Sequence, residues 1–133
     1  MLGKAFDKID LYKQTLNASW LRQQVIANNI ANVNTPGYKR QTIEFENTLK
    51  EYLELSEGIS VETTNEKHIG NFTVNDLSPR IETIGHTSMR EDNNNVNIDV
   101  EMAEQAKNSL KYNAVTEQLN SQYRRLRMAI TGR

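Results

Sequence analysis

The sequence predicts a mainly α-helical protein. Long N-terminal and C-terminal helices should pack as a coiled-coil-like pair beside a small irregular middle segment with a short helix and short β-strands. Residues 4–32 and 98–131 contain no proline or glycine, whereas both prolines and four of the six glycines lie between them. Both stretches repeat apolar side chains at steps of three and four residues, the spacing of one helix face. We therefore divide the chain into an N-terminal helix (1–34), a junction turn with a small middle region (35–97) and a C-terminal helix (98–133).

The N-terminal helix carries a heptad-like apolar seam. Its large members are Leu2, Ile9, Tyr12, Leu16, Ile26, Ile30 and Val33. Ser19 and Gln23 interrupt this seam, so we expect the helix pair to be marginal on its own, with assembly completing its burial. The helix should end near Asn32, because asparagine tolerates the left-handed conformation of a helix C-cap.

A tight turn is expected directly after this helix. Proline at the second position fixes φ near about −65°, and glycine at the third accepts a positive φ, as a type II turn requires. The residues of the turn are Thr35, Pro36, Gly37 and Tyr38. We expect three preceding asparagines to hydrogen-bond nearby backbone or a neighbouring helix, or simply to cap the helix end: Asn28, Asn29 and Asn32.

The middle region mixes short elements. A short amphipathic helix is indicated by Phe45, Leu49, Tyr52 and Leu53, and Gly58 should close it. Alternation over residues 59–64 predicts a brief strand. Further strands are expected around Phe72 and Val74 and around Ile81 and Thr83.

The C-terminal helix should begin at Asn97 or Asp99, since either side chain can cap the first turn. Its stripe again repeats at steps of three and four, with Met102, Tyr112, Leu119, Tyr123, Leu126 and Ile130 as large members. Three arginines, at 124, 125 and 127, lie near its end, where the helix dipole favours cations. That explanation is simpler than contact with nucleic acid or a membrane.

Charge is balanced overall at −1 but is unevenly distributed. Residues 1–40 and 102–133 each hold six Lys or Arg against two Asp or Glu, whereas residues 41–101 hold four against thirteen. The simplest interpretation is solvated helix faces, and the alternative is electrostatic steering between neighbouring molecules. The balanced total does not indicate a nucleic-acid binder.

The sequence shows no constellation of reactive groups, so we expect no enzyme and no catalytic, cofactor-binding or metal site. The absence of cysteine excludes disulfides and thiolate chemistry. His68 and His86 lack metal-ligand spacing, and residues 92–99 lack the central glycine of a calcium loop. No apolar run approaches the roughly 20 residues that span a bilayer, and no cleavable signal peptide is visible at the N-terminus. Direct membrane insertion is therefore not expected.

Two motifs resemble the family of bacterial flagellar rod proteins. Residues 27–40 (ANNIANVNTPGYKR) are similar to the segment that joins the N-terminal helix to the next domain in flagellar axial proteins. Residues 94–103 (NNVNIDVEMA) resemble the entry to the C-terminal helix of B-type proximal rod proteins, except that Asn97 stands where an acidic residue is frequent. The short chain also favours a proximal rod subunit over the larger hook and distal rod proteins.

The resemblance implies a structural subunit that polymerises helically through its terminal helices, forming part of the drive shaft and export channel. It also implies export through the flagellar type III apparatus without a cleaved signal, and a place in the rod of the basal body, in the cell envelope or periplasm. The implied partners are copies of itself and other rod proteins, with the MS-ring, the rod adaptor subunit and the export gate at the rod base.

We expect the assembly interface to use large side chains of both seams, although each could also belong to an intramolecular core. The candidates are Leu16, Ile26, Ile30, Tyr112, Leu119, Leu126 and Ile130. The alternative function is a helical adaptor or secretion chaperone that binds partners without polymerising.

Overall fold

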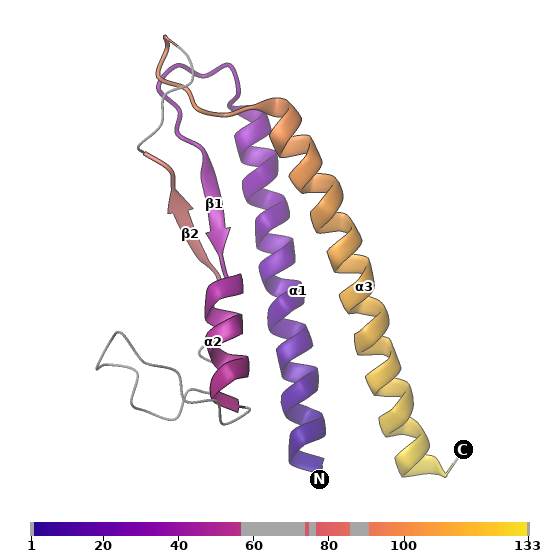
Figure 1. Cartoon of the computed structure of the whole chain (residues 1–133). Helices are drawn as coiled ribbons and strands as arrows, with labels where there is room; N and C mark the ends of the chain where they lie inside the picture. Colours follow the sequence, from indigo (N-terminus) through magenta and orange to yellow (C-terminus); the bar gives the residue numbers. More distant parts are fainter. Residues whose placement is uncertain (1, 57–73, 75–76, 86–90, 133) are drawn as a thin grey trace.

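The protein is described by a computed structural model covering residues 2–56, 74, 77–85 and 91–132. Its elements are α1 (Leu2–Ala31), β1 (Gln41–Glu44), α2 (Glu46–Ser56), β2 (Arg80–Thr83) and α3 (Ile98–Thr131). The two long helices run antiparallel side by side, with the two-stranded sheet and α2 on the opposite flank of α1 (Figure 1). The prediction of a mainly helical protein with packed terminal helices is confirmed.

The apolar core lies between α1 and the segment formed by β1 and α2. Ala18 and Val25 of α1 pack there against Ile43 and Phe45, with Leu77 closing the cluster. Phe45 and Leu77 are almost completely buried, at 1% and 0% exposed. Fully burying such a side chain contributes about 1.5–3 kcal/mol, so this flank of α1 holds most of the hydrophobic stabilisation.

Strands β1 and β2 form a two-stranded antiparallel sheet in which Ile43 pairs with Ile81. The expected strand at Ile81 and Thr83 is therefore present, and the expected short helix begins one residue after Phe45. Strand β1 was not expected, because Ile43 is its one apolar residue and shows no alternation. The strand expected over residues 59–64 lies outside the described residues, as does Phe72, whereas Val74 lies in a 3-10 turn and not in the expected strand.

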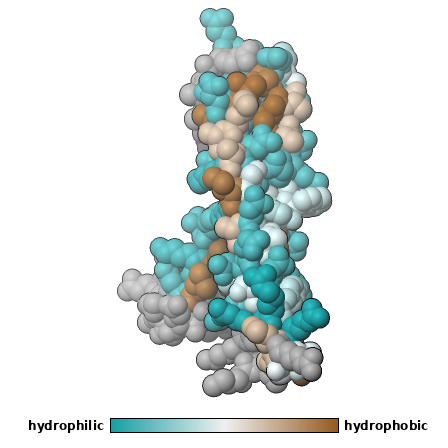
Figure 2. All heavy atoms as spheres, turned by 90° about the vertical axis from the view of Figure 1, so that its right-hand side faces the viewer, coloured by the Kyte–Doolittle hydropathy of each residue, from teal (hydrophilic) through white to brown (hydrophobic). Residues whose placement is uncertain are grey.

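Helix α3 has little buried surface of its own. Of its 34 residues only Glu101 and Asn108 are buried, and both are polar. Large apolar side chains stay exposed along it, up to 72% for Leu110 and 81% for Ile130. On the side of the molecule that α3 faces, apolar atoms are interspersed with polar ones and gather near its first turns (Figure 2). The buried residues that α3 contributes to the subunit are therefore polar.

Candidate functional site

A buried polar network joins the end of α1 to the start of α3. We call it the junction network, and it consists of Asn29, Tyr38, Arg40, Gln41, Asn94, Asn95 and Glu101. Asn29, fully buried, is at its centre. Its Nδ2 donates to the Gln41 carbonyl at 2.8 Å and to Glu101 Oε2 at 3.0 Å, while its Oδ1 accepts from the Gln41 N–H at 3.0 Å. One side chain thereby fixes α1, β1 and α3 relative to each other.

Glu101 is a buried carboxylate in the first turns of α3, with no exposed surface. Arg40 pairs with it through Nε, and Asn29 supplies the second donor. A buried charge is tolerated only when it is both paired and hydrogen-bonded, and Glu101 meets this condition. Burial raises the pKa of the nearby Tyr38 hydroxyl, and the negative charge of Glu101 raises it further. That hydroxyl donates to Asn29 Oδ1 at 3.2 Å.

Asn94 caps the C-terminal end of α1 from a distant part of the chain. Its buried Nδ2 contacts the carbonyls of Asn32, Val33 and Thr35 at 3.0, 3.1 and 2.8 Å. These carbonyls belong to the turn directly after α1, which ends at Ala31, and backbone carbonyls outside regular structure need donors from elsewhere. The Oδ1 of Asn94 accepts from the Val96 N–H at 2.8 Å. The amide therefore uses its donors and its acceptor at once.

The chain reverses at Thr35–Tyr38, where the Tyr38 N–H donates to the Thr35 carbonyl at 3.3 Å. Gly37 has φ +72°, and Pro36 cannot adopt a positive φ, so the turn is of type II. The Gly37 N–H also donates to the Asp92 carbonyl at 2.8 Å. The turn is thereby tied to the loop before α3.

The remaining predicted asparagines have local roles. Asn32 Nδ2 donates to the Asn28 carbonyl at 2.8 Å, whereas the Asn28 side chain is exposed. Asn97 is the N-cap of α3, with its Oδ1 accepting from the N–H groups of Asp99 at 2.9 Å and Val100 at 3.4 Å. Asp99 is thus not the cap. It lies in the first turn, where its negative charge interacts favourably with the positive end of the helix dipole.

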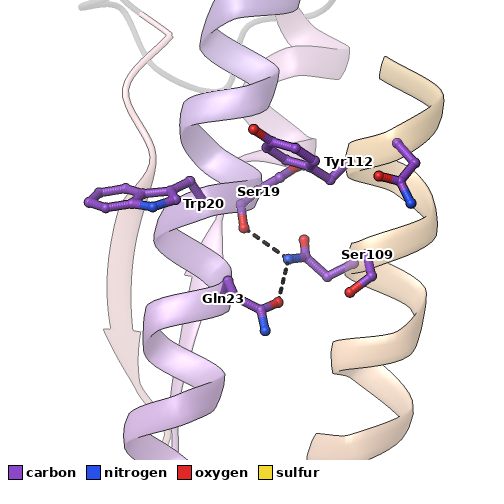
Figure 3. A pocket seen from close by; sticks show the side chains of 7 residues that line it. Ser19, Trp20, Gln23, Ser109 and Tyr112 are labelled. Atoms are coloured by element: carbon purple, nitrogen blue, oxygen red, sulfur yellow. Dashed lines mark hydrogen bonds between the residues drawn. The ribbon is translucent and has the colours of Figure 1, made fainter. Parts of the chain in front are cut away.

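A second polar contact joins the long helices further along. Asn108 Nδ2 donates to the Ser19 carbonyl at 2.9 Å and to Gln23 Oε1 at 3.2 Å (Figure 3). Among the described residues, the Asn108 Oδ1 is buried without a hydrogen-bond partner. Beside it lies a groove of about 250 Å³ that Trp20 and Tyr112 help to line. The two interruptions of the α1 seam are therefore residues that meet α3.

A third contact links three helices through Glu46. Its two carboxylate oxygens bind Arg22 Nη2 at 2.6 Å and Lys111 Nζ at 2.7 Å. Burial, the largest single influence, would raise the pKa of Glu46. The hydrogen bonds and charges of Arg22 and Lys111 outweigh it and lower the pKa to about 2. The ionised form is thus favoured by the fold.

We predict that this contact makes stability depend on pH under acid conditions. Because the folded pKa of Glu46 lies below its ordinary value of 4.5, its stabilising contribution is fully present above about pH 4.5 and is lost as pH falls toward 2. Urea unfolding of wild type and Glu46→Gln should show a difference in the free energy of unfolding that is constant near neutral pH and shrinks below 4.5. A difference that stays constant down to pH 2 would contradict the lowered pKa of Glu46. Lys111→Gln removes one of the two cations, so it should narrow the pH range over which the difference shrinks.

Comparisons with known proteins decide the family. A model of the family described as "Flagella basal body rod protein" matches residues 13–39. The chain is 35% identical to the flagellar basal body rod protein FlgB of Bacillus subtilis over 120 residues, 90% of each chain. It is 33% identical to FlgB of Aquifex aeolicus over 128 residues, 96% of each chain. It is also 35% identical to FlgB of Buchnera aphidicola over 136 residues, 99% of this chain and 100% of that one.

The chain belongs to the FlgB family of flagellar basal body rod proteins. The segment matched by the family model contains most of α1 and the whole type II turn. It therefore covers the α1 side of the junction network, including Asn29. The partner of Asn29 on α3, Glu101, lies outside the matched segment.

The residues expected at the assembly interface differ in how much of their side chain is exposed. Ile26 is buried at 4% exposed, whereas Tyr112 and Ile130 are exposed at 42% and 81%. The other candidates are half-buried: Leu16, Ile30, Leu119 and Leu126. Their part in assembly stays a prediction.

Sequence reasoning missed the long-range members of the junction network. In the sequence nothing distinguishes three of them from ordinary surface residues, because arginine, asparagine and glutamate are usually exposed: Arg40, Asn94 and Glu101. A signal was present for Asn94, since it opens the motif at residues 94–103. Within the described ranges no three His, Cys, Asp or Glu side chains gather closely enough to hold a metal ion, and no helix there is long and apolar enough to cross a membrane. His68 and His86 lie outside those ranges.

Proposed function

We propose that this rod protein is a structural subunit of the proximal rod that polymerises helically through its terminal helices. In this role it forms part of the drive shaft and of the export channel. The observation that carries the proposal is the surface of α3, which buries only two polar residues of its own. Eight large apolar side chains of α3 are exposed: Ile98, Val100, Met102, Leu110, Tyr112, Tyr123, Met128 and Ile130.

Exposed apolar side chains on this scale favour association, because each contributes about 1.5–3 kcal/mol once fully buried. A subunit that meets the next copy through two different surfaces builds an open helical array without any catalytic group. We further propose copies of itself and other rod proteins as lateral partners, and the MS-ring, rod adaptor subunit and export gate at the rod base. Export without a cleaved signal, through the type III apparatus, completes the proposal.

The test replaces two exposed apolar residues of α3 together, Leu110→Ser and Ile130→Ser. We expect the circular dichroism spectrum of the isolated chain to stay the same. The free energy of unfolding should change by less than about 0.5 kcal/mol per site, because both side chains already face solvent. The amount of this chain in isolated basal bodies, and motility, should fall sharply. Leu53→Ser on α2, at 41% exposed, is the matched control and should have little effect on either.

Equal incorporation of the α3 variant and the Leu53→Ser control would contradict assembly through α3. The alternative, a helical adaptor or secretion chaperone, would leave basal bodies without density for this chain in electron microscopy. Repeated density along the rod axis would instead support the structural subunit.

A further inference from the structure

A cationic cleft of about 290 Å³ opens where α1, β1, the start of α2 and the first half of α3 meet. Four cations line it: Arg22, Arg40, Lys107 and Lys111. Two carboxylates, Glu46 and Glu104, also line it. The buried Glu101 is not part of the lining but binds Arg40. The cleft region thus holds four positive charges against three negative ones.

The carboxylates of the cleft are already engaged. Glu46 binds both Arg22 and Lys111, and Glu101 binds Arg40. Lys107 has only a loose contact of 3.6 Å with Glu104, and its side chain is 76% exposed. Lys107 is therefore a cation held at the mouth of the cleft with a weak partner.

Both arginines keep unused donors. Arg22 bonds only through Nη2, to Glu46 and to the Ile43 carbonyl, and Arg40 only through Nε. Across the described residues their other guanidinium nitrogens have no acceptor, yet the only buried unpartnered side-chain atom is Asn108 Oδ1. These nitrogens are therefore open to solvent within the cleft. A guanidinium fork matches the two oxygens of a carboxylate, so the cleft is suited to a carboxylate group.

The sheet of the same chain carries two carboxylates that suit this cleft. Because Glu82 pairs with Thr42 and Glu44 with Arg80, Glu44 and Glu82 lie diagonally on one face of the sheet. Glu82 is exposed, and a hydrogen bond to Glu44, followed by the charge of Glu44, raises its pKa. Like charges held this close would be relieved by an incoming cation.

We propose that the cleft receives the neighbouring carboxylates of Glu44 and Glu82 from a second copy of this chain. Neither residue lines the cleft, so the pairing joins two different surfaces, is heterologous and continues from copy to copy, as helical assembly requires. The inference rests on the proposed function and adds an electrostatic contact to the apolar one on α3. It also assigns a role to the uneven charge of the sequence.

The test is zero-length carbodiimide cross-linking of isolated basal bodies, which joins a lysine amine only to a carboxylate in direct contact. We expect a covalent dimer of the chain, at about twice 15.3 kDa. Mass spectrometry of that dimer should show Lys107 joined to Glu44 or Glu82. Lys107→Gln should remove the dimer, because the amide cannot react.

Lys50 provides a matched control on α2. It is 75% exposed and contacts Glu54 at 3.7 Å, almost as Lys107 contacts Glu104. Lys50→Gln should leave the dimer intact. Lys107→Glu should lower the amount of chain in basal bodies by on the order of tenfold, and Lys50→Glu by less than about twofold, because like charges across a contact are strongly unfavourable.

The possible failures are distinguishable. Basal bodies that contain the chain but give no dimer, or that give Lys107 joined to a different protein, would overturn this inference and leave the proposed function standing. If Lys107→Glu and Lys50→Glu lowered the amount of chain in basal bodies equally, the inference would be overturned as well, because the loss would then be a general effect of charge. Basal bodies that lack the chain altogether would overturn the proposed function and this inference together.

Discussion

Replacing Arg40 by alanine is expected to lower the free energy of unfolding by about 3–5 kcal/mol, because it leaves the Glu101 carboxylate buried without its cation. Glu101 has no exposed surface, so water cannot take the place of the guanidinium without opening the junction network. Urea unfolding followed by circular dichroism measures the change. Arg80→Ala, which removes an exposed arginine from β2, is the control and should cost less than about 0.5 kcal/mol.

A double variant separates a buried charge from a general loss of packing. Arg40→Met with Glu101→Leu removes both members of the pair, and it should recover most of the stability that Arg40→Ala loses. If Arg40→Ala costs less than about 1 kcal/mol, or if the double variant is no more stable than the single one, the ion pair is not what holds the start of α3.

Asn94→Asp is expected to cost about 3 kcal/mol, although it changes the side chain by only one group. The amide donates to three carbonyls in the turn directly after α1, and a carboxylate has no hydrogen to donate. It would also place a negative charge at a helix C-terminus, where the dipole disfavours one. The unfolding midpoint in urea, with unchanged slope, measures the loss.

The neighbouring Asn93 is the matched control for this substitution. It is exposed and adopts a positive φ of 61°, which aspartate also tolerates. Asn93→Asp should therefore be close to neutral. Similar losses for the two substitutions would show that the effect comes from charge in this loop and not from the cap on α1.

The long helices were predictable because Gly and Pro are absent from residues 4–32 and 98–131 and occur between them. The sequence did not indicate which neighbouring element each helix face contacts. The seam at Ile9, Leu16 and Ile26 was expected to meet α3, and its two interruptions, Ser19 and Gln23, do contact Asn108 of that helix. The structure also buries a second face of α1, with Ala18 and Val25, against Ile43 and Phe45, and the seam did not indicate this face. Periodicity identifies a stripe but does not identify what covers it, so a helix between two neighbours is ambiguous.

The junction network shows a second limit of sequence reasoning. The type II turn was predictable because Pro36 and Gly37 restrict their own backbone. The bonds of Asn29 to Glu101 and of Arg40 to Glu101 join residues 72 and 61 positions apart. Nothing local marks such pairs, since their stability depends on burial that only the folded chain creates.

The attachment of α3 has a mechanical consequence. The helix is fixed by Glu101, by Asn108 and by the ion pair of Lys111 with Glu46, and no residue after Asn108 is buried. The 20 residues from Tyr112 to Thr131 therefore form an arm of about 30 Å anchored at one end. A rotation of a few degrees at the anchor moves the tip by a few ångströms without breaking the anchoring bonds. Identical chains could in this way occupy sites of slightly different shape, as at the boundary between two unlike tubes, while the junction keeps the same geometry in each.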